Sequence, residues 1–384
     1  MSADPDSIPL QLIPQAGGGI PVAPQVLLIS YLKRFKGELM RSARAHSLLI
    51  ALILIYWAIT MAVASWLAMR PLTYFDGFDH ELATITGLYF GVLFISYVIY
   101  IMVAVHPGRL SLYLWRDLTS RILTIDRLCT VLPAALLLPI LISSYSSFKR
   151  EIPLLNPYHW DPALAHLGRV LFGGHQSWEW LQPLLGHPWI TWSLNFIYNS
   201  WFFVFFGVLF WQMTSMSRPR LRMQYLTAVV LQWALLGSLL ATLVSSAGPA
   251  FYGRLTGGED PYASLLHYLR SVDPIHGLWA VQTQDFLWRC HVNKDLLAGC
   301  GLSAMPSMHV ATAFGFVMLG FATNRWLGSF FAVYCVFIFI ASVHLGWHYA
   351  SDGIVGMIGA LLVWCLTGWI LERRAVRNWL GDTL

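Results

Sequence analysis

The sequence contains few charged residues and few cysteines for its length. Only 11% of its 384 residues are Asp, Glu, Lys or Arg, whereas soluble domains carry about 25%. A single water-soluble core is therefore excluded. Five cysteines in a chain of this length do not form the framework of a disulfide-stapled miniprotein. The net charge of +5 is small and spread along the chain, so no nucleic-acid partner is predicted.

Hydrophobic residues make up 57% of the sequence, and they cluster in runs of about twenty, which is the length of a helix that crosses a bilayer. The sequence therefore predicts an all-α fold, a polytopic transmembrane helix bundle with about eight spans. The predicted spans are residues 46–69, 82–105, 128–146, 190–214, 224–247, 307–323, 326–345 and 352–371.

Lys and Arg are absent from all eight predicted spans, as expected from the cost of placing a cation in lipid. If the N-terminus is cytoplasmic, 16 of the 24 Lys and Arg residues lie in the inner segments and 8 in the outer ones. This asymmetry predicts that both termini are cytoplasmic. Residues 1–45 are expected to form a mobile tail rich in Pro and Gly, followed by a basic juxtamembrane helix.

Two long outer loops separate the predicted spans. Residues 147–189 place several Trp beside apolar residues, which predicts short helices at the lipid interface. Residues 248–306 begin with Gly-Pro, and a loop of this length is usually functional. Cys290 and Cys300 in this second loop can pair if the compartment is oxidising. The other cysteines lie in spans, where we expect them to pack: Cys129, Cys335 and Cys365.

Two motifs carry the candidate chemistry. The second loop ends in CGLSAMPSMHVATAF, and the last two spans are joined by HLGWHYASDGIVG. His309, His348 and Asp352 are all predicted on the outer side. His348 and Asp352 are four residues apart, so on a helix they share one face, and the carboxylate can orient the imidazole as a nucleophile. His309 can then protonate the departing oxygen, while Ser307 and free amides at the helix start offer donors to a phosphate.

Each of these residues also has a simpler interpretation. A single His at a membrane boundary is commonly an interfacial polar group. Asp352, which precedes a glycine, can serve simply as a helix cap with no catalytic role. It is the combination of P-S-x-H and H-x-x-x-D at span ends on one side that favours catalysis.

Together P-S-M-H and H-Y-A-S-D resemble the second and third signatures of the type 2 phosphatidic acid phosphatase superfamily. This resemblance covers about residues 120–384 and implies a core of six transmembrane helices, with the two spans in 46–119 as an addition. It implies that His348 is a nucleophile that forms a phosphohistidine, that Asp352 supports it, and that His309 is the acid. Pro306 and Ser307 then belong to the phosphate site.

The sequence departs from this superfamily at two signatures. The first signature is a Lys followed seven residues later by Arg-Pro. It is missing here: Arg218-Pro219 supplies an Arg-Pro, but Trp211 occupies the position of the Lys. The third lacks its Ser-Arg, and Ala341 and Ser342 occupy those places. Because a transferring phosphoryl group needs compensating charge, another group must supply it. The candidates are Arg254, Arg270, Arg289, Lys294 and His344.

The inositol phosphorylceramide synthase branch shows similar departures, and P-S-M-H, H-Y and Gly248-Pro249 match its pattern. The resemblance thus favours a lipid phosphotransferase with a phospholipid donor and a ceramide or diacylglycerol acceptor, active at a periplasmic or luminal face without cofactor or metal. His344 and His348 form H-x-x-x-H, but no Glu follows His344 as a zinc motif would require.

The alternatives to a lipid phosphotransferase are a phosphatase that hydrolyses phosphatidate or polyprenyl diphosphate, and a non-catalytic transporter or scaffold.

Overall fold

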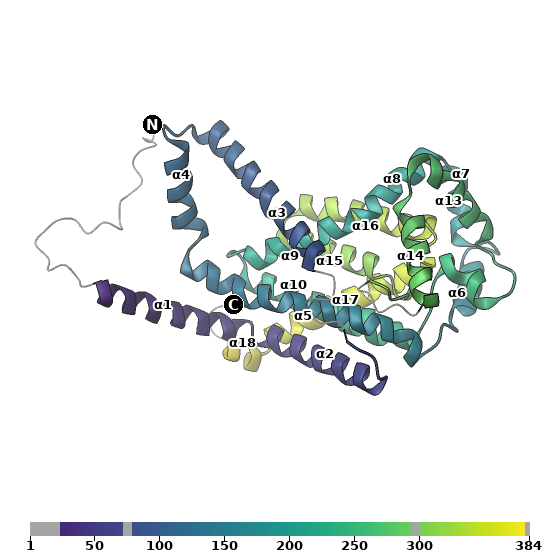
Figure 1. Ribbon diagram of the computed structural model, residues 1–384, viewed down its shortest axis with the longest axis horizontal. Coiled ribbons are helices and arrows are strands. Elements are labelled where there is room, and N and C mark those ends of the chain that lie inside the picture. The colour runs from purple at the N-terminus through teal and green to yellow at the C-terminus, as the bar shows by residue number, and fades with distance from the viewer. Residues whose placement is uncertain (1–23, 72–78, 294–298, 381–384) are drawn as a thin grey trace, which may run out of the picture.

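The computed structural model describes residues 24–71, 79–293 and 299–380, and every regular element in these ranges is a helix (Figure 1). The all-α prediction is therefore confirmed. In the described ranges seven helices are long and apolar enough to cross a membrane. They are α2 (Ser47–Trp66), α3 (Asp79–Tyr100), α5 (Ile125–Leu155), α8 (Pro188–Asn199) continued by α9 (Trp201–Thr214), α10 (Pro219–Leu231) continued to Leu243, α16 (Arg325–His344) and α17 (Ala350–Glu372).

The remaining predicted span, 307–323, is a shorter apolar helix, α15 (Met308–Thr323). Ser307 is the N-cap of this helix, and its hydroxyl oxygen accepts a hydrogen bond from the amide of Val310. This helix lies inside the bundle and packs against α9, α10, α16 and α17. The predicted mobile tail falls mostly on residues 1–23, which lie outside the described ranges.

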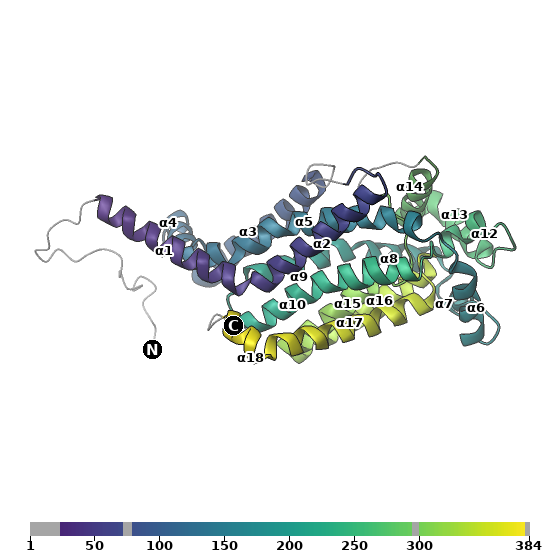
Figure 2. The ribbon, with the colours of Figure 1, turned by 90° about the horizontal axis from the view of Figure 1, so that it is seen from below.

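The spanning helices run along the long axis of the molecule, and shorter helices gather at its two ends (Figures 1 and 2). The cap helices lie at one end and comprise α6 (Asp161–Leu171), α7 (Ser177–Leu185), α12 (Tyr252–Thr256), α13 (Ala263–His276) and α14 (Trp279–Asn293). The opposite end carries α1 (Pro24–Ala45), α4 (Leu110–Asp117) and α18 (Arg374–Leu380). The short helices predicted in the first outer loop are thus present, and the basic juxtamembrane segment is helical.

Helices α2 and α3 lie outside the group of helices that surrounds α15. Helix α2 packs against α5 and α10, and α3 packs against α9, where the ring of Tyr89 meets Phe210 at 5.2 Å. The centre of the bundle is formed by fully buried apolar side chains, including Phe316, Leu319 and Ile338.

Helix α5 is longer than its apolar run predicted. We expected a span over 128–146, but the helix continues to Leu155. One side of its last turns is buried in protein, where Ser147, Glu151 and Ile152 have no exposed surface, while Leu154 on the other side is exposed. The prediction that residue 147 begins a loop was therefore wrong, and this extension carries Lys149 toward the cap helices.

The cysteines divide into a bonded pair and single thiols. Cys290 of α14 and Cys300 form a disulfide across ten residues. Cys129 and Cys335 are buried as expected, but Cys365 is exposed on α17. The prediction that Cys365 is a packing residue was wrong, because no helix in the described part of the chain covers that face of the span.

Removal of the disulfide is expected to destabilise the cap helices. For a loop of this length the chain-entropy contribution is about 2–3 kcal/mol, so Cys290→Ser with Cys300→Ser should lower the thermal unfolding midpoint of the detergent-purified protein. Cys365→Ser is the matched control and should leave it unchanged. Equal midpoints for the double variant and the control would show that the bond adds no stability.

Candidate active site

The two candidate catalytic segments meet at the cap end of the bundle, where α15 and α17 both begin. The amide of Ser307 donates to the carbonyl oxygen of Asp352 at 3.0 Å. Gly356, one turn further along α17, lies so close that a Cβ there would be 2.8 Å from the carbonyl oxygen of Ser307. Two motifs that are forty residues apart in the sequence are therefore joined directly through their backbones.

His348 and Asp352 form a buried pair at the start of α17. Nδ1 of His348 lies 3.3 Å from Oδ2 of Asp352, with 8% and 0% of the side chains exposed. The same oxygen accepts the amide of Tyr349 at 3.1 Å, so the carboxylate caps the helix and contacts the imidazole at once. An imidazole that donates through Nδ1 presents Nε2 as its free nitrogen. This is the arrangement required of a nucleophile held by an orienting acid.

His309 lies in the first turn of α15 among aromatic rings. Its imidazole stacks on Tyr198 with ring centroids 4.5 Å apart, and Trp201 is 4.3 Å away. The indole of Trp201 is itself held by a 2.7 Å hydrogen bond to Thr312. The imidazole is close enough to His348 and to Lys149 to interact electrostatically with both. The structure thus gathers two imidazoles, a carboxylate and an ammonium group at one end of the bundle.

The Gly-Pro turn that opens the second outer loop lies between the two catalytic segments. The carbonyl oxygen of Ser246 accepts a hydrogen bond from the amide of Ala304 at 2.9 Å. The hydroxyl oxygen of Ser246 accepts a second hydrogen bond from the amide of Met305 at 3.1 Å. On the other side, the amide of Ala250 donates to Gly346 at 2.9 Å. Gly248 has a φ of +96°, and a Cβ there would be 2.6 Å from the carbonyl oxygen of Trp347. Only glycine fits this close approach.

The other predicted substrate-binding residues lie at different distances from this group. Ser307 is fully buried and Pro306 precedes it. His344 is buried on α16, where Nε2 lies 2.9 Å from the hydroxyl of Thr191. Arg289 is exposed on α14, and Lys294 lies outside the described residues. Their roles in substrate binding remain predictions.

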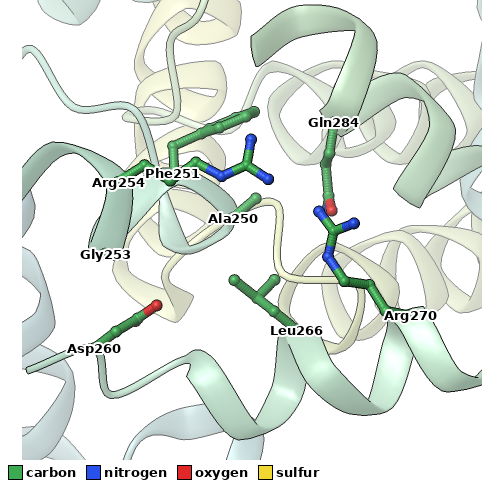
Figure 3. Close-up of a pocket in the computed structure, with 8 residues that line it drawn as sticks. All are labelled: Ala250, Phe251, Gly253, Arg254, Asp260, Leu266, Arg270 and Gln284. Carbon is green, nitrogen blue, oxygen red and sulfur yellow. The ribbon is translucent and has the colours of Figure 1, made fainter.

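Arg254 and Arg270 line a cavity of about 190 Å³ among the cap helices (Figure 3). They share the carboxylate of Asp285, with Nη2 to Oδ1 distances of 3.6 and 2.8 Å. Burial tends to raise the pKa of Asp285, but the hydrogen bond and charge of Arg270 and the charge of Arg254 hold that pKa below its usual value. The carboxylate is therefore ionised at neutral pH and balances one of the two guanidinium charges.

This cavity adjoins the loop that leads to His348. Gln284, which lines the cavity, donates to the carbonyl of Leu345 at 2.9 Å, and Ala250 contributes both to the lining and to the bond with Gly346. Among the described residues, no three His, Cys, Asp or Glu side chains form a group that would hold a metal ion.

Lys149 was not among the residues selected from the sequence. It lies on the helical extension of α5, where its backbone and side chain pack against Gly301. A sequence signal was available: Asn156-Pro157 follows seven residues after Lys149, which is the spacing of the first signature with Asn in place of Arg. The side-chain amide of Asn156 donates a hydrogen bond to the carbonyl oxygen of Thr242 at 2.7 Å. The Arg-Pro pair considered in the sequence, Arg218-Pro219, lacks the Lys and lies at the opposite end of the bundle.

Comparison with known proteins gives one family match. The family model described as the PAP2 superfamily matches residues 162–366, more than half of the chain. This range contains His309, His348 and Asp352 and excludes Lys149. No curated protein and no solved structure match the sequence.

We predict that Gly248→Ala disrupts the junction of the catalytic segments. The backbone conformation at this residue costs other residues about 1–3 kcal/mol, and the added methyl group would collide with Trp347 and Ala304. The thermal unfolding midpoint in detergent should fall by several degrees. Gly258→Ala is the control, because nothing lies within 4 Å of a Cβ at that position. A Gly248 variant as stable as the control would contradict this account of the turn.

Proposed function

Because the chain belongs to the PAP2 superfamily, whose members are generally phosphatases or phosphotransferases of lipid phosphates, we propose that it is a membrane lipid phosphotransferase that acts through a phosphohistidine on His348. The observation that carries this proposal is the convergence of His348, Asp352 and His309 at the start of two packed helices. The likeness to the inositol phosphorylceramide synthase pattern favours transfer of a phosphoryl head group to a lipid hydroxyl.

The first step forms the phosphoenzyme. Nε2 of His348 attacks phosphorus and forms a nitrogen–phosphorus bond, while the bond from phosphorus to the glycerol oxygen of the donor breaks. The electron pair of that bond stays on the glycerol oxygen, which takes a proton from His309, and diacylglycerol departs. Asp352 keeps the imidazole oriented and balances its positive charge.

The second step returns the enzyme to its starting state. His309, now neutral, takes the proton from the hydroxyl of the acceptor lipid, and the acceptor oxygen forms a new bond to phosphorus. The nitrogen–phosphorus bond breaks, and its electron pair returns to His348. The same intermediate attacked by water gives hydrolysis, so the phosphatase alternative differs only in the acceptor.

Lys149 provides the positive charge that the sequence departures had left unassigned. It interacts electrostatically with His309, and it packs against Gly301 in the segment that leads to the P-S-M-H motif. We assign it to the phosphate oxygens, in preference to Arg254 and Arg270, because those two residues already share the Asp285 carboxylate.

His348→Ala should abolish the activity without loss of folding. Detergent-purified protein is incubated with phosphatidylinositol and phosphatidate labelled in the phosphate, with and without ceramide or diacylglycerol, and the label is followed into lipid and into water-soluble phosphate. The wild type should accumulate an acid-labile phosphohistidine when no acceptor is present. His166→Ala, an exposed position on α6, is the control. Full turnover by the His348 variant would exclude this mechanism, and label only in the aqueous phase would favour the phosphatase.

Lys149→Met should reduce kcat about 10²- to 10³-fold, the usual effect of removing one group that stabilises developing charge. Lys149→Arg should recover part of the lost rate, because it keeps the charge. The control is Arg169→Ala, which removes an exposed cation from α6. A Lys149→Met variant that matches the control in kcat would show that another group neutralises the phosphate.

A further inference from the structure

A buried carboxylate outside the catalytic group connects the cap helices to the nucleophile. Asp161 is the first residue of α6 and has no exposed surface. Its Oδ2 accepts the amide of Ala247 at 2.9 Å. Its Oδ1 accepts the amide of Gly248 at 2.8 Å and the hydroxyl of Tyr349 at 2.7 Å. Burial raises the pKa of Asp161, while these three donors act against that rise.

Tyr349 is held at two points. Its hydroxyl donates to Asp161, and its backbone amide donates to Oδ2 of Asp352, the oxygen that also faces Nδ1 of His348. Since Tyr349 directly follows His348, a shift of its ring would move both partners of the catalytic pair. The side chain of Tyr349 thus acts as a rigid strut between α6 and the start of α17.

Packing around this strut agrees with such a role. Tyr349 belongs to a buried cluster with Leu164 and Ala165 of α6 and with Met305, which lies just before the P-S-M-H motif. Helix α6 therefore shares one apolar cluster with both candidate catalytic segments. The Asp161 carboxylate adds a directional bond to only one of them, the segment that carries His348.

We propose that Asp161 is a positioning residue for His348, acting through the hydroxyl of Tyr349 to fix the backbone that orients the His348–Asp352 pair. This inference rests on the proposed function for its catalytic consequence. The two amide bonds from Ala247 and Gly248 give Asp161 a structural role as well, so the test must separate the two roles.

Tyr349→Phe makes this separation, because it removes the hydroxyl but leaves the ring and both amide bonds to Asp161. We expect kcat and the single-turnover rate of phosphoenzyme formation from labelled phosphatidylinositol to fall about 10- to 100-fold, as a small displacement of a reacting group does. KM should change less than about twofold, because the Tyr349 hydroxyl is bonded to the buried Asp161 and is not assigned to substrate binding. Asp161→Asn should lower kcat in the same direction, and the double variant should be no slower than the slower single variant.

Tyr262→Phe is the matched control. Tyr262 contacts Tyr349 edge-to-face at 5.7 Å, and its hydroxyl donates to Gln176, not to Asp161. This variant should keep wild-type kcat. If Tyr349→Phe matches it in kcat and in phosphorylation rate, the positioning role is overturned. The role is also overturned if both variants lose kcat in parallel with the thermal midpoint, since that is the result of a general loss of packing.

A second measurement does not depend on turnover. Nitrogen-15 NMR of histidine-labelled protein should show one fixed tautomer of His348, protonated at Nδ1, in the wild type and in Tyr262→Phe, and a mixture in Tyr349→Phe. An unchanged single tautomer in Tyr349→Phe overturns the inference. If the wild type forms no phosphoenzyme, the proposed function fails by itself, and the tautomer measurement still decides whether Asp161 positions His348.

Discussion

The close approach of α15 and α17 is the constraint on which the site depends. It requires glycine at position 356, since any side chain would meet the backbone of Ser307, and it is fixed by the hydrogen bond from Ser307 to the carbonyl of Asp352. Two helices at this separation bring their first turns together, and the candidate acid and nucleophile both lie in or beside those turns. Without this contact, His309 would have no defined relation to His348.

The spans and the pairing of His348 with Asp352 were largely predictable from the sequence, because both depend on local patterns. Runs of apolar residues reveal helices that face lipid, and the spacing of His348 and Asp352 reveals a shared helix face. The end of α5 was missed for a physical reason. One side of its last turns is covered by protein, so residues such as Glu151 on that side need not be apolar. A hydropathy pattern detects helices that face lipid, and it does not detect helix that is covered by protein.

The contacts between loops could not be predicted in the same way. Nothing in the sequence distinguishes Asp161, which accepts three hydrogen bonds in the interior, from other acidic residues that precede a proline. The arginines of the second outer loop show the converse problem. Arg254 and Arg270 are suitable phosphate ligands by residue type, but the fold places Asp285 beside both, and this pairing depends on how α12, α13 and α14 pack.

The length of α15 differs from that of the helices around it. Its 16 residues extend about 24 Å at 1.5 Å per residue, whereas the hydrocarbon layer is about 30 Å thick. Helix α15 is therefore about 6 Å shorter than this layer, so it does not cross the hydrocarbon by itself. Under the proposed function, a phospholipid that reached His309 and His348 by lateral diffusion would keep its acyl chains in the bilayer.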